Sequence, residues 1–236
     1  MWYPEHKEEL ELFIENAFKK KPKIKSKKIN GLIVPHAGYE YSGKVAGKAF
    51  SLLKNKKVDK AIIIGPSHYV NLSGPITATN GEWKTSLGKI AIIQFPSLEV
   101  MDLQAEHSIK NQVPFLQKIG IKEIIPIMIG RIEDKEAKEL AKKIAKINAV
   151  YIFSTDLSHF LTYEEAVQKD RSSIKIIKEL NETNFKSIDA CGYFPLRVLF
   201  HLCKIKKTHP HLIEYKNSGD ITGDKSTVVG YASFWF

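Results

Sequence analysis

The sequence predicts a single α/β domain in which a central, mostly parallel mixed sheet is flanked by helices. Apolar runs of four or five residues recur along the chain and end at Gly, Pro or a polar residue, which is typical of strands buried on both faces. Segments with apolar residues at helical spacing lie between these runs, so strands and helices alternate. With 236 residues and 43% hydrophobic content, the chain can bury one sizeable core.

The N-terminal segment is expected to place a helix on the outside of this domain. Residues 4–18 have apolar side chains at helical spacing, namely Leu10, Phe13, Ile14 and Ala17. Residues 19–28 contain seven lysines and Pro22 without an interleaved aromatic, which indicates a solvated basic linker. We therefore divide the chain into an N-terminal helix with its linker, residues 1–28, and an α/β domain, residues 29–236.

The strands and helices of the α/β domain are predicted from short apolar runs, from apolar residues at helical spacing and from turn residues. Strands are predicted at residues 29–34, 61–64, 123–129, 149–153, 211–215 and 227–236, from short apolar runs. Helices are predicted at residues 44–53, 113–119, 135–146, 163–180, 185–190 and 196–203. Residues 72–93 alternate between turns at Gly74-Pro75, Asn80-Gly81 and Leu87-Gly88, which favours antiparallel edge strands with Trp83 in the core. The glycines and proline of PHAGYEYSG, at 35–43, are expected to prevent regular structure there.

Polar side chains follow three of the predicted strands directly. His36 follows residues 31–34, Ser67-His68 follows residues 61–64, and Asp156 and His159 follow residues 149–153. Open α/β sheets bind ligands beyond the carboxyl ends of their strands. If these strands are parallel neighbours, the three histidines and the aspartate converge on one rim, which is the predicted active site.

This set of residue types favours a metal centre. Imidazole is the commonest metal ligand, and two imidazoles with one anionic ligand leave open positions on a divalent ion. The third ligand is Asp156 or Glu106, which would suit iron, or the thiolate of Cys191, which would favour softer ions. His107 and His159 are then candidates for general acid or base.

The two cysteines have different surroundings in the sequence. Cys191 precedes Gly192 at a turn before a helix, where backbone amides and a nearby cation lower the pKa of a thiol, so we expect a functional thiolate. Cys203 lies in an apolar helical stretch and is expected to be buried and inert.

Composition limits the partners and the compartment. The net charge of +10 comes almost wholly from lysine, with Arg131, Arg171 and Arg197 as the arginines, so we expect no nucleic-acid partner. The Lys- and Glu-rich helices are typical of proteins from hot environments. No apolar stretch is long enough to span a membrane, and the acidic, aromatic N-terminus is unlike a signal peptide, so a cytoplasmic protein without membrane contact is expected.

Five motifs in order resemble the Memo family, in particular the Memo-like protein B of archaeal and bacterial Memo systems. They are PHAGYEYSG at 35–43, GPSHY at 65–69, EHSI at 106–109, STDLSHF at 154–160 and CG at 191–192. The resemblance covers about residues 29–236 and implies the α/β fold of the class III extradiol dioxygenases, which use non-haem iron. It also implies that His36, His68 and Cys191 are metal ligands and that His107, Asp156 and His159 surround them. The dioxygenases have a carboxylate where this chain has Cys191, and a thiolate is oxidisable.

The expected function is an iron- or copper-dependent redox enzyme related to these dioxygenases, with iron favoured and copper or zinc as alternatives, and with metal and substrate bound at the carboxyl rim. A zinc-type hydrolase, in which an ion-bound water is the nucleophile, remains open. So does a non-catalytic module that holds a metal or binds a peptide or protein partner. The small-molecule substrate and the oligomeric state are left open.

Overall fold

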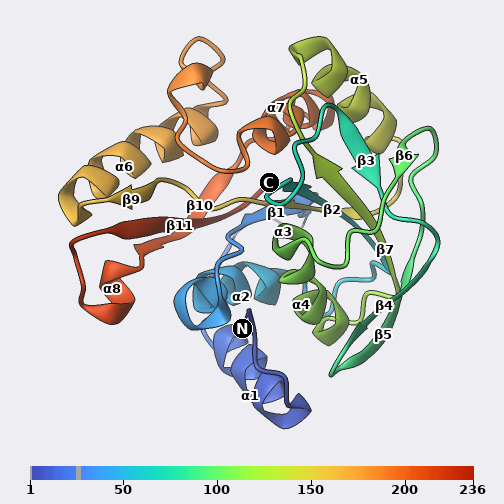
Figure 1. The fold of residues 1–236 in the computed structure, drawn as a ribbon, viewed down its shortest axis with the longest axis horizontal. Helices are drawn as coiled ribbons and strands as arrows, with labels where there is room; N and C mark the ends of the chain where they lie inside the picture. The colour runs from blue at the N-terminus through green and yellow to red at the C-terminus, as the bar shows by residue number, and fades with distance from the viewer. Residues whose placement is uncertain (1, 25–27) are drawn as a thin grey trace.

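A computed structural model describes residues 2–24 and 28–236. Its helices are α1 (Lys7–Phe18), α2 (Lys44–Phe50), α3 (His107–Lys110), α4 (Val113–Lys118), α5 (Asp134–Ile144), α6 (Tyr163–Glu179), α7 (Tyr193–Lys206) and α8 (Gly219–Thr222). Its strands are β1 (Gly31–Val34), β2 (Lys60–Pro66), β3 (Pro75–Thr77), β4 (Gly81–Thr85), β5 (Gly88–Ile92), β6 (Glu99–Val100), β7 (Glu123–Ile129), β8 (Val150–Ser154), β9 (His159–Leu161), β10 (His211–Asn217) and β11 (Val228–Trp235). The predicted α/β class, with a mixed sheet between helices, is confirmed (Figure 1).

The sheet brings the three strands that precede the site motifs side by side. Its main path runs β10-β11-β1-β8-β2-β7-β3-β6, and β8 pairs in parallel with both β1 and β2. Strand β2 also pairs in parallel with β7, whereas β11 and β3 extend this central block antiparallel. The carboxyl ends of β1, β8 and β2 therefore meet at one edge of the sheet, as predicted.

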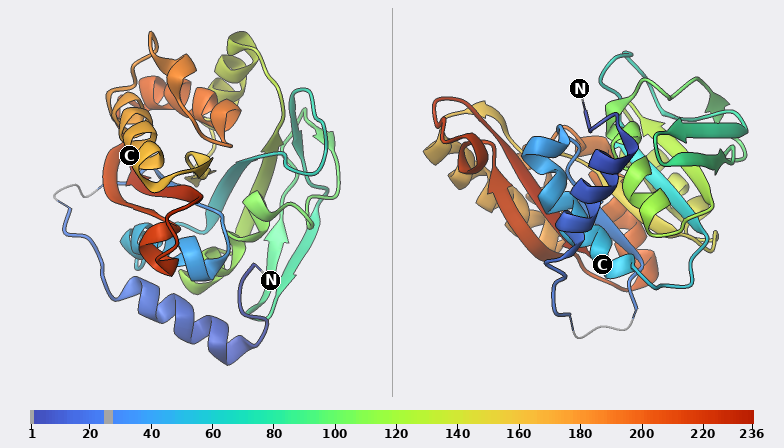
Figure 2. Two further views of the ribbon diagram at one scale, coloured as in Figure 1. Left: turned by 60° about the vertical axis from the view of Figure 1, so that its left-hand side comes forward. Right: turned by 90° about the horizontal axis from the view of Figure 1, so that it is seen from below.

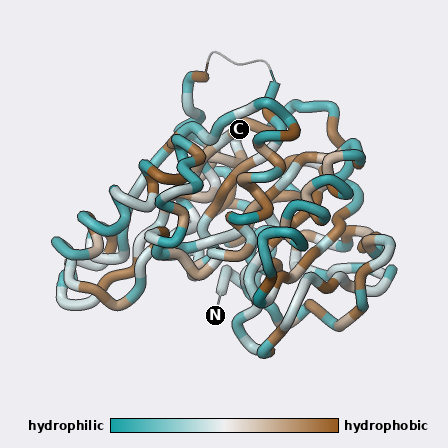
Figure 3. Tube along the Cα trace, turned by 90° about the horizontal axis from the view of Figure 1, so that it is seen from above, coloured by the Kyte–Doolittle hydropathy of each residue, from teal (hydrophilic) through white to brown (hydrophobic). Residues whose placement is uncertain are grey.

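Two apolar cores cover the two faces of the sheet. In β2, Ile62 and Ile64 belong to the core with α5, α6 and α7, whereas Ala61 and Ile63 belong to the core with α1, α2 and α4. Successive side chains of a strand point to opposite faces, which is why a continuous apolar run serves both cores. Hydrophobic residues accordingly gather inside the molecule and hydrophilic ones outside (Figure 3).

The N-terminal helix packs on the outside of the body against α2 (Figure 2). It begins at Lys7, after the position expected from Pro4. Part of the predicted basic linker, residues 25–27, lies outside the described residues. Of the helices in residues 2–24 and 28–236, none combines the length and the apolar character needed to cross a membrane.

Three local expectations were wrong. Residues 39–43 form a π-helical turn, in which the carbonyl of Gly38 accepts hydrogen bonds from the amides of Tyr41 and Ser42. The helix expected at 185–190 is only a short 3-10 turn, Phe185–Ser187, because the chain becomes extended at Ile188. Helix α7 begins at Tyr193 rather than at Leu196, since a proline is tolerated in the first turn of a helix.

The antiparallel strands predicted in residues 72–93 from their turn residues are present. Strands β4 and β5 form a hairpin, and β3 pairs antiparallel with β7. Trp83 is 2% exposed, so its predicted place in the core is confirmed.

Candidate metal centre

His36 is held just after β1 by residues at and beyond the ends of β8 and α3. Its backbone amide donates to Asp156 Oδ1 at 2.8 Å, and its Nδ1 lies 2.9 Å from Ser154 Oγ. The side-chain amide of Asn111 donates to the His36 carbonyl at 2.6 Å. The imidazole is 1% exposed, and these contacts leave its Nε2 pointing toward the rim.

His68 is oriented by Glu106, the residue that caps α3. Both the amide and Nδ1 of His68 lie 2.9 Å from the Glu106 carboxylate, on Oε2 and Oε1 respectively. An ionised carboxylate only accepts hydrogen bonds, so Nδ1 carries the proton and Nε2 keeps its lone pair. This is the carboxylate–histidine arrangement that supports metal-binding imidazoles.

Cys191 approaches from the loop before α7. Its Sγ lies 3.3 Å from His36 Nε2, and it accepts a hydrogen bond from the amide of Asp156 at 3.2 Å. The next residue has to be glycine here, because a Cβ at Gly192 would come within 2.5 Å of the Thr155 side chain. This close approach brings the start of α7 to the end of β8.

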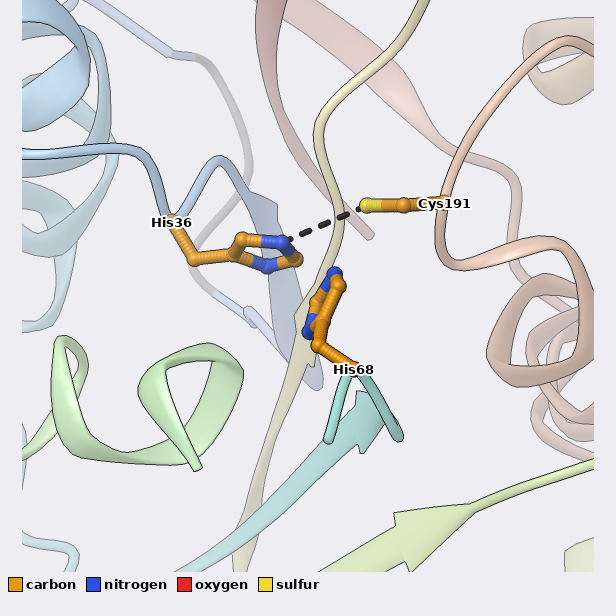
Figure 4. A group of neighbouring side chains, drawn as sticks. All are labelled: His36, His68 and Cys191. Carbon is orange, nitrogen blue, oxygen red and sulfur yellow. Dashed lines mark hydrogen bonds between the residues drawn. The ribbon is translucent and has the colours of Figure 1, made fainter. Parts of the chain in front are cut away.

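His36, His68 and Cys191 form a donor set whose ligand atoms all lie within 4.8 Å of one another (Figure 4). An ion bound at about 2.0–2.1 Å from nitrogen and about 2.3 Å from sulfur in tetrahedral geometry separates the two by roughly 3.5 Å. The distance of 3.3 Å between His36 Nε2 and Cys191 Sγ is close to that value. The residues therefore fit a metal ion bound by two nitrogens and one sulfur.

His107 stands beside this donor set. Its ring centroid is 4.1 Å from that of His68 and 5.2 Å from that of His36. Trp2 stacks on it at 4.1 Å with an interplanar angle of 6°. Its Nδ1 is buried without a hydrogen-bond partner and lies 3.4 Å from Glu106 Oε1. His68, Glu106 and His107 make a second group close enough to hold an ion.

Asp156 and His159 lie at different depths. Asp156 is 4% exposed, and its Oδ2 is 3.8 Å from His36 Nε2, so it lies beside the donor set instead of capping a helix. His159 is on β9, which pairs with β11, and its ring packs against Phe160. Burial lowers the pKa of His36, and the charge of His159 lowers it further.

Burial dominates the electrostatics of the rim. It lowers the pKa of His107 to about 4, and the nearby His68 acts in the same direction. Burial also raises the pKa of Asp156 to about 7, although hydrogen bonds from the backbone amides of His36 and Ala37 act to lower it. For Glu106 burial opposes ionisation, but hydrogen bonds from His68 and Ser108 lower the pKa overall. This cluster of mostly neutral imidazoles suits metal binding, which requires the imidazole lone pair.

Burial raises the pKa of the Cys191 thiol, so the expectation of a lowered pKa was wrong for the metal-free protein. The amides of Gly192, in the turn, and of Asp156, after β8, do favour the thiolate, but desolvation and the Asp156 charge outweigh them. The helix start that was expected to favour the thiolate lies two residues further on. A bound cation is then what would hold Cys191 as a thiolate.

Three contributors to the rim, Asn111, Gln112 and Trp2, had no clear signal in the sequence. Asn111 and Gln112 reach the β1 loop from the α3–α4 junction, and Gln112 also donates to Ser154 Oγ at 3.0 Å. Trp2 reaches His107 from the N-terminal segment. Glu106, which was expected as a possible metal ligand, accepts hydrogen bonds from His68 and Ser108 and also belongs to the second group that could hold an ion.

The fold and the site define an α/β protein that carries a candidate His–His–Cys metal centre at the carboxyl ends of parallel strands. The sequence model of the family described as Memo-like protein matches residues 1–235. The chain therefore belongs to the Memo family, as its ordered motifs indicated.

Relatives called MEMO1 family protein support this membership. The chain is 37% identical to one from Sulfurisphaera tokodaii, over 91% of this chain and 86% of the relative. It is 37% identical to one from Methanobrevibacter smithii, over 99% and 95% respectively. It is 33% identical to one from Aquifex aeolicus, over 100% and 96%.

Proposed function

We propose that this protein is a metal-dependent redox enzyme that binds iron, or alternatively copper, through His36, His68 and Cys191. Its substrate is a small molecule bound at the carboxyl rim of the sheet, and dioxygen is the oxidant. The observation that supports this most directly is the approach of His36 Nε2 to Cys191 Sγ at 3.3 Å, with His68 completing the group.

The donor set favours a softer ion over a hard one. Thiolate and imidazole suit iron, copper and zinc, whereas magnesium and calcium prefer oxygen ligands. A bound iron or copper ion would supply one-electron chemistry to substrate and oxygen. Two imidazoles and one thiolate leave open positions for both.

The surrounding residues have separate roles in this proposal. Glu106 holds His68 in the tautomer that presents Nε2. Asp156 and His107 stand within reach of the rim with perturbed pKa values and would transfer protons to or from substrate. His159, on β9, is a further candidate for proton transfer to or from the substrate.

Metal analysis of protein purified without oxygen tests the site. We expect close to one ion per chain, and loss of most of it in His36→Ala and in His68→Ala, with an unchanged circular dichroism spectrum. His201→Ala is the matched control, because His201 pairs with Asp134 on α5. Full metal retention in both site variants would overturn the proposed centre.

A binding module is the second candidate, and two exposed aromatics favour it. Tyr69, next to His68, is 58% exposed, and Phe160, next to His159, is 77% exposed. Aromatic side chains on a rim of this kind are typical of surfaces that contact a peptide or protein. Oxygen uptake by the metal-loaded protein with candidate small molecules supports the enzyme, whereas peptide binding without turnover supports the module.

A further inference from the structure

A cavity of about 360 Å³ lies beside the candidate metal centre and has not been assigned a role above. The N-terminal segment, α1 and the π-helical turn line it, and it opens to solvent. Its side chains are aromatic or acidic, chiefly Trp2, Tyr3, Phe13, Tyr39, Glu9 and Glu40. Trp2 belongs both to this cavity and to the stack on His107, so the cavity and the rim share a wall.

The aromatic wall is built on a buried residue. Tyr39 is 3% exposed, stacks on Phe115 at 4.7 Å between centroids, and donates its hydroxyl hydrogen to the Asn111 carbonyl at 2.8 Å. The rings of Tyr3 and Phe13 lean against it with centroids at 5.4 Å and 5.3 Å. The Tyr39 amide also donates to the Trp2 carbonyl at 2.8 Å, which ties the N-terminal segment to the wall. The rings are thus held in place before any ligand arrives.

The cavity is locally negative, whereas the protein as a whole carries a positive net charge. Glu9 and Glu40 are exposed, and neither makes an ion pair or a side-chain hydrogen bond within residues 2–24 and 28–236. No basic side chain of those residues lines the cavity. The chain as a whole carries a net charge of +10, so two unpaired carboxylates at a cavity without lysine are a marked local exception.

We propose that this cavity binds a small organic cation that carries an alkylated ammonium group. Aromatic faces attract such a cation within about 6 Å of the ring centroid, and its methyl groups gain from contact with the rings. The carboxylates of Glu9 and Glu40 add Coulomb attraction at the mouth. A neutral apolar ligand would leave the carboxylates unused, and an anion would be repelled by them.

The adjoining hollow has a different character. It shares Trp2 and Tyr3 but is lined by Lys84 and Lys110, and Lys110 Nζ lies 6.0 Å from the centroid of the Tyr3 ring. Tyr3 therefore already lies beside a cation of the protein itself. The proposed preference is confined to the cavity that contains Glu9 and Glu40, and it does not depend on the metal or on the proposed redox function.

Choline binding to the full-length protein tests the proposal, measured by saturation-transfer NMR on the choline methyl groups. The probe for charge is its uncharged isostere, the alcohol in which carbon replaces the ammonium nitrogen. We expect the isostere to bind at least about tenfold more weakly. We expect Glu9→Gln and Glu40→Gln each to weaken choline binding by up to about fivefold, the scale of an exposed ion pair.

Glu8→Gln is the matched control, because Glu8 is an exposed residue of α1 that does not line the cavity. It removes the same charge and should leave choline binding unchanged. A peptide with a trimethylated lysine separates two sources of the same group: tighter binding of the peptide than of choline would place the cation on a polypeptide.

Equal binding of choline and its isostere would overturn the proposal. So would a failure of both choline and the trimethyl-lysine peptide to bind. An equal effect of Glu8→Gln and Glu40→Gln would also overturn it, since only net charge would then matter. Thermal denaturation of each variant checks that the fold is retained. Metal content is measured beside it and is expected to stay at the level of the parent protein.

Discussion

Glu106 Oε1 lies 2.9 Å from His68 Nδ1, although 38 positions separate the two residues in the chain. The same carboxylate accepts hydrogen bonds from the backbone amides of His68 and Ser108. It thereby joins the end of β2 to the start of α3. Glu106 is the residue that decides which nitrogen of His68 faces the candidate metal centre.

Glu106→Gln is expected to weaken metal binding by about 10- to 100-fold, the usual effect of removing such a partner. The oxygen of the glutamine side chain can still accept a hydrogen bond from the Ser108 amide, so α3 should form. Its NH2 group can donate to His68 Nδ1, so His68 is no longer held in the tautomer that has its proton on Nδ1. Competition with a chromogenic chelator measures the affinity. Glu99→Gln, at an exposed position of β6, is the control. Equal affinities in the Glu106 variant and the parent would contradict this role.

Alkylation distinguishes the two cysteines. Cys203 is fully buried and Cys191 is partly exposed, so iodoacetamide should modify Cys191 first in the metal-free protein. Burial raises the pKa of both thiols, so we expect slow modification of Cys191 at neutral pH and faster modification in alkaline buffer. Added iron or copper should protect Cys191, as mass spectrometry of the labelled peptides would show. Metal binding without protection would mean that the thiol is not a ligand.

Gly192→Ala is expected to disturb the site from outside the donor set. The new Cβ would lie within 2.5 Å of the Thr155 side chain and 3.2 Å of the Ser154 carbonyl. We expect a loss of about 1–3 kcal/mol in the free energy of unfolding, as for overpacking, together with weaker metal binding. Gly81→Ala is the control, because its Cβ would meet no atom closer than 4.0 Å. Chemical denaturation measures both variants, and an unchanged Gly192 variant would show that α7 can move away.

Asp170 should make stability depend on pH. Its Oδ1 accepts the Ser158 amide at 2.9 Å and its Oδ2 accepts the Tyr215 hydroxyl at 2.8 Å, yet burial raises its pKa in the folded state. A raised folded pKa stabilises the protein most below the unfolded value, about 3.9 for Asp, and this contribution is lost as pH rises through the folded pKa.

Asp170→Asn removes this titration. We therefore expect the difference in melting temperature, variant minus parent, to become more positive between pH 4 and pH 8, on the order of a few degrees. Differential scanning calorimetry across this range measures it. Asp224→Asn is the control, because hydrogen bonds from Ser226 lower the pKa of this exposed carboxyl and it is ionised in both the folded and the unfolded state above about pH 5, so its difference should stay nearly flat. A flat difference for Asp170→Asn would contradict the effect of burial.

The sequence by itself was sufficient for the central strands of the sheet and for the edge at which their polar side chains gather. The apolar runs of β1, β2 and β8 are too short for a helix and end at Gly, Pro or a polar residue, which favours strands buried on both faces. Since parallel strands end at the same edge, His36, His68 and Asp156 could be placed together before the structure was known. These inferences depend on local patterns, which a strand or helix carries within a few residues.

Only the tertiary structure decided how the side chains pair. Cys191 reaches His36 across 155 positions, Glu106 hydrogen-bonds to His68, and Trp2 stacks on His107. Each of these contacts depends on how α3, α7 and the N-terminal segment pack against the rim, which no periodicity records. The raised pKa of Cys191 has the same origin, because desolvation is set by all the atoms that surround the thiol and not by its neighbours in the chain.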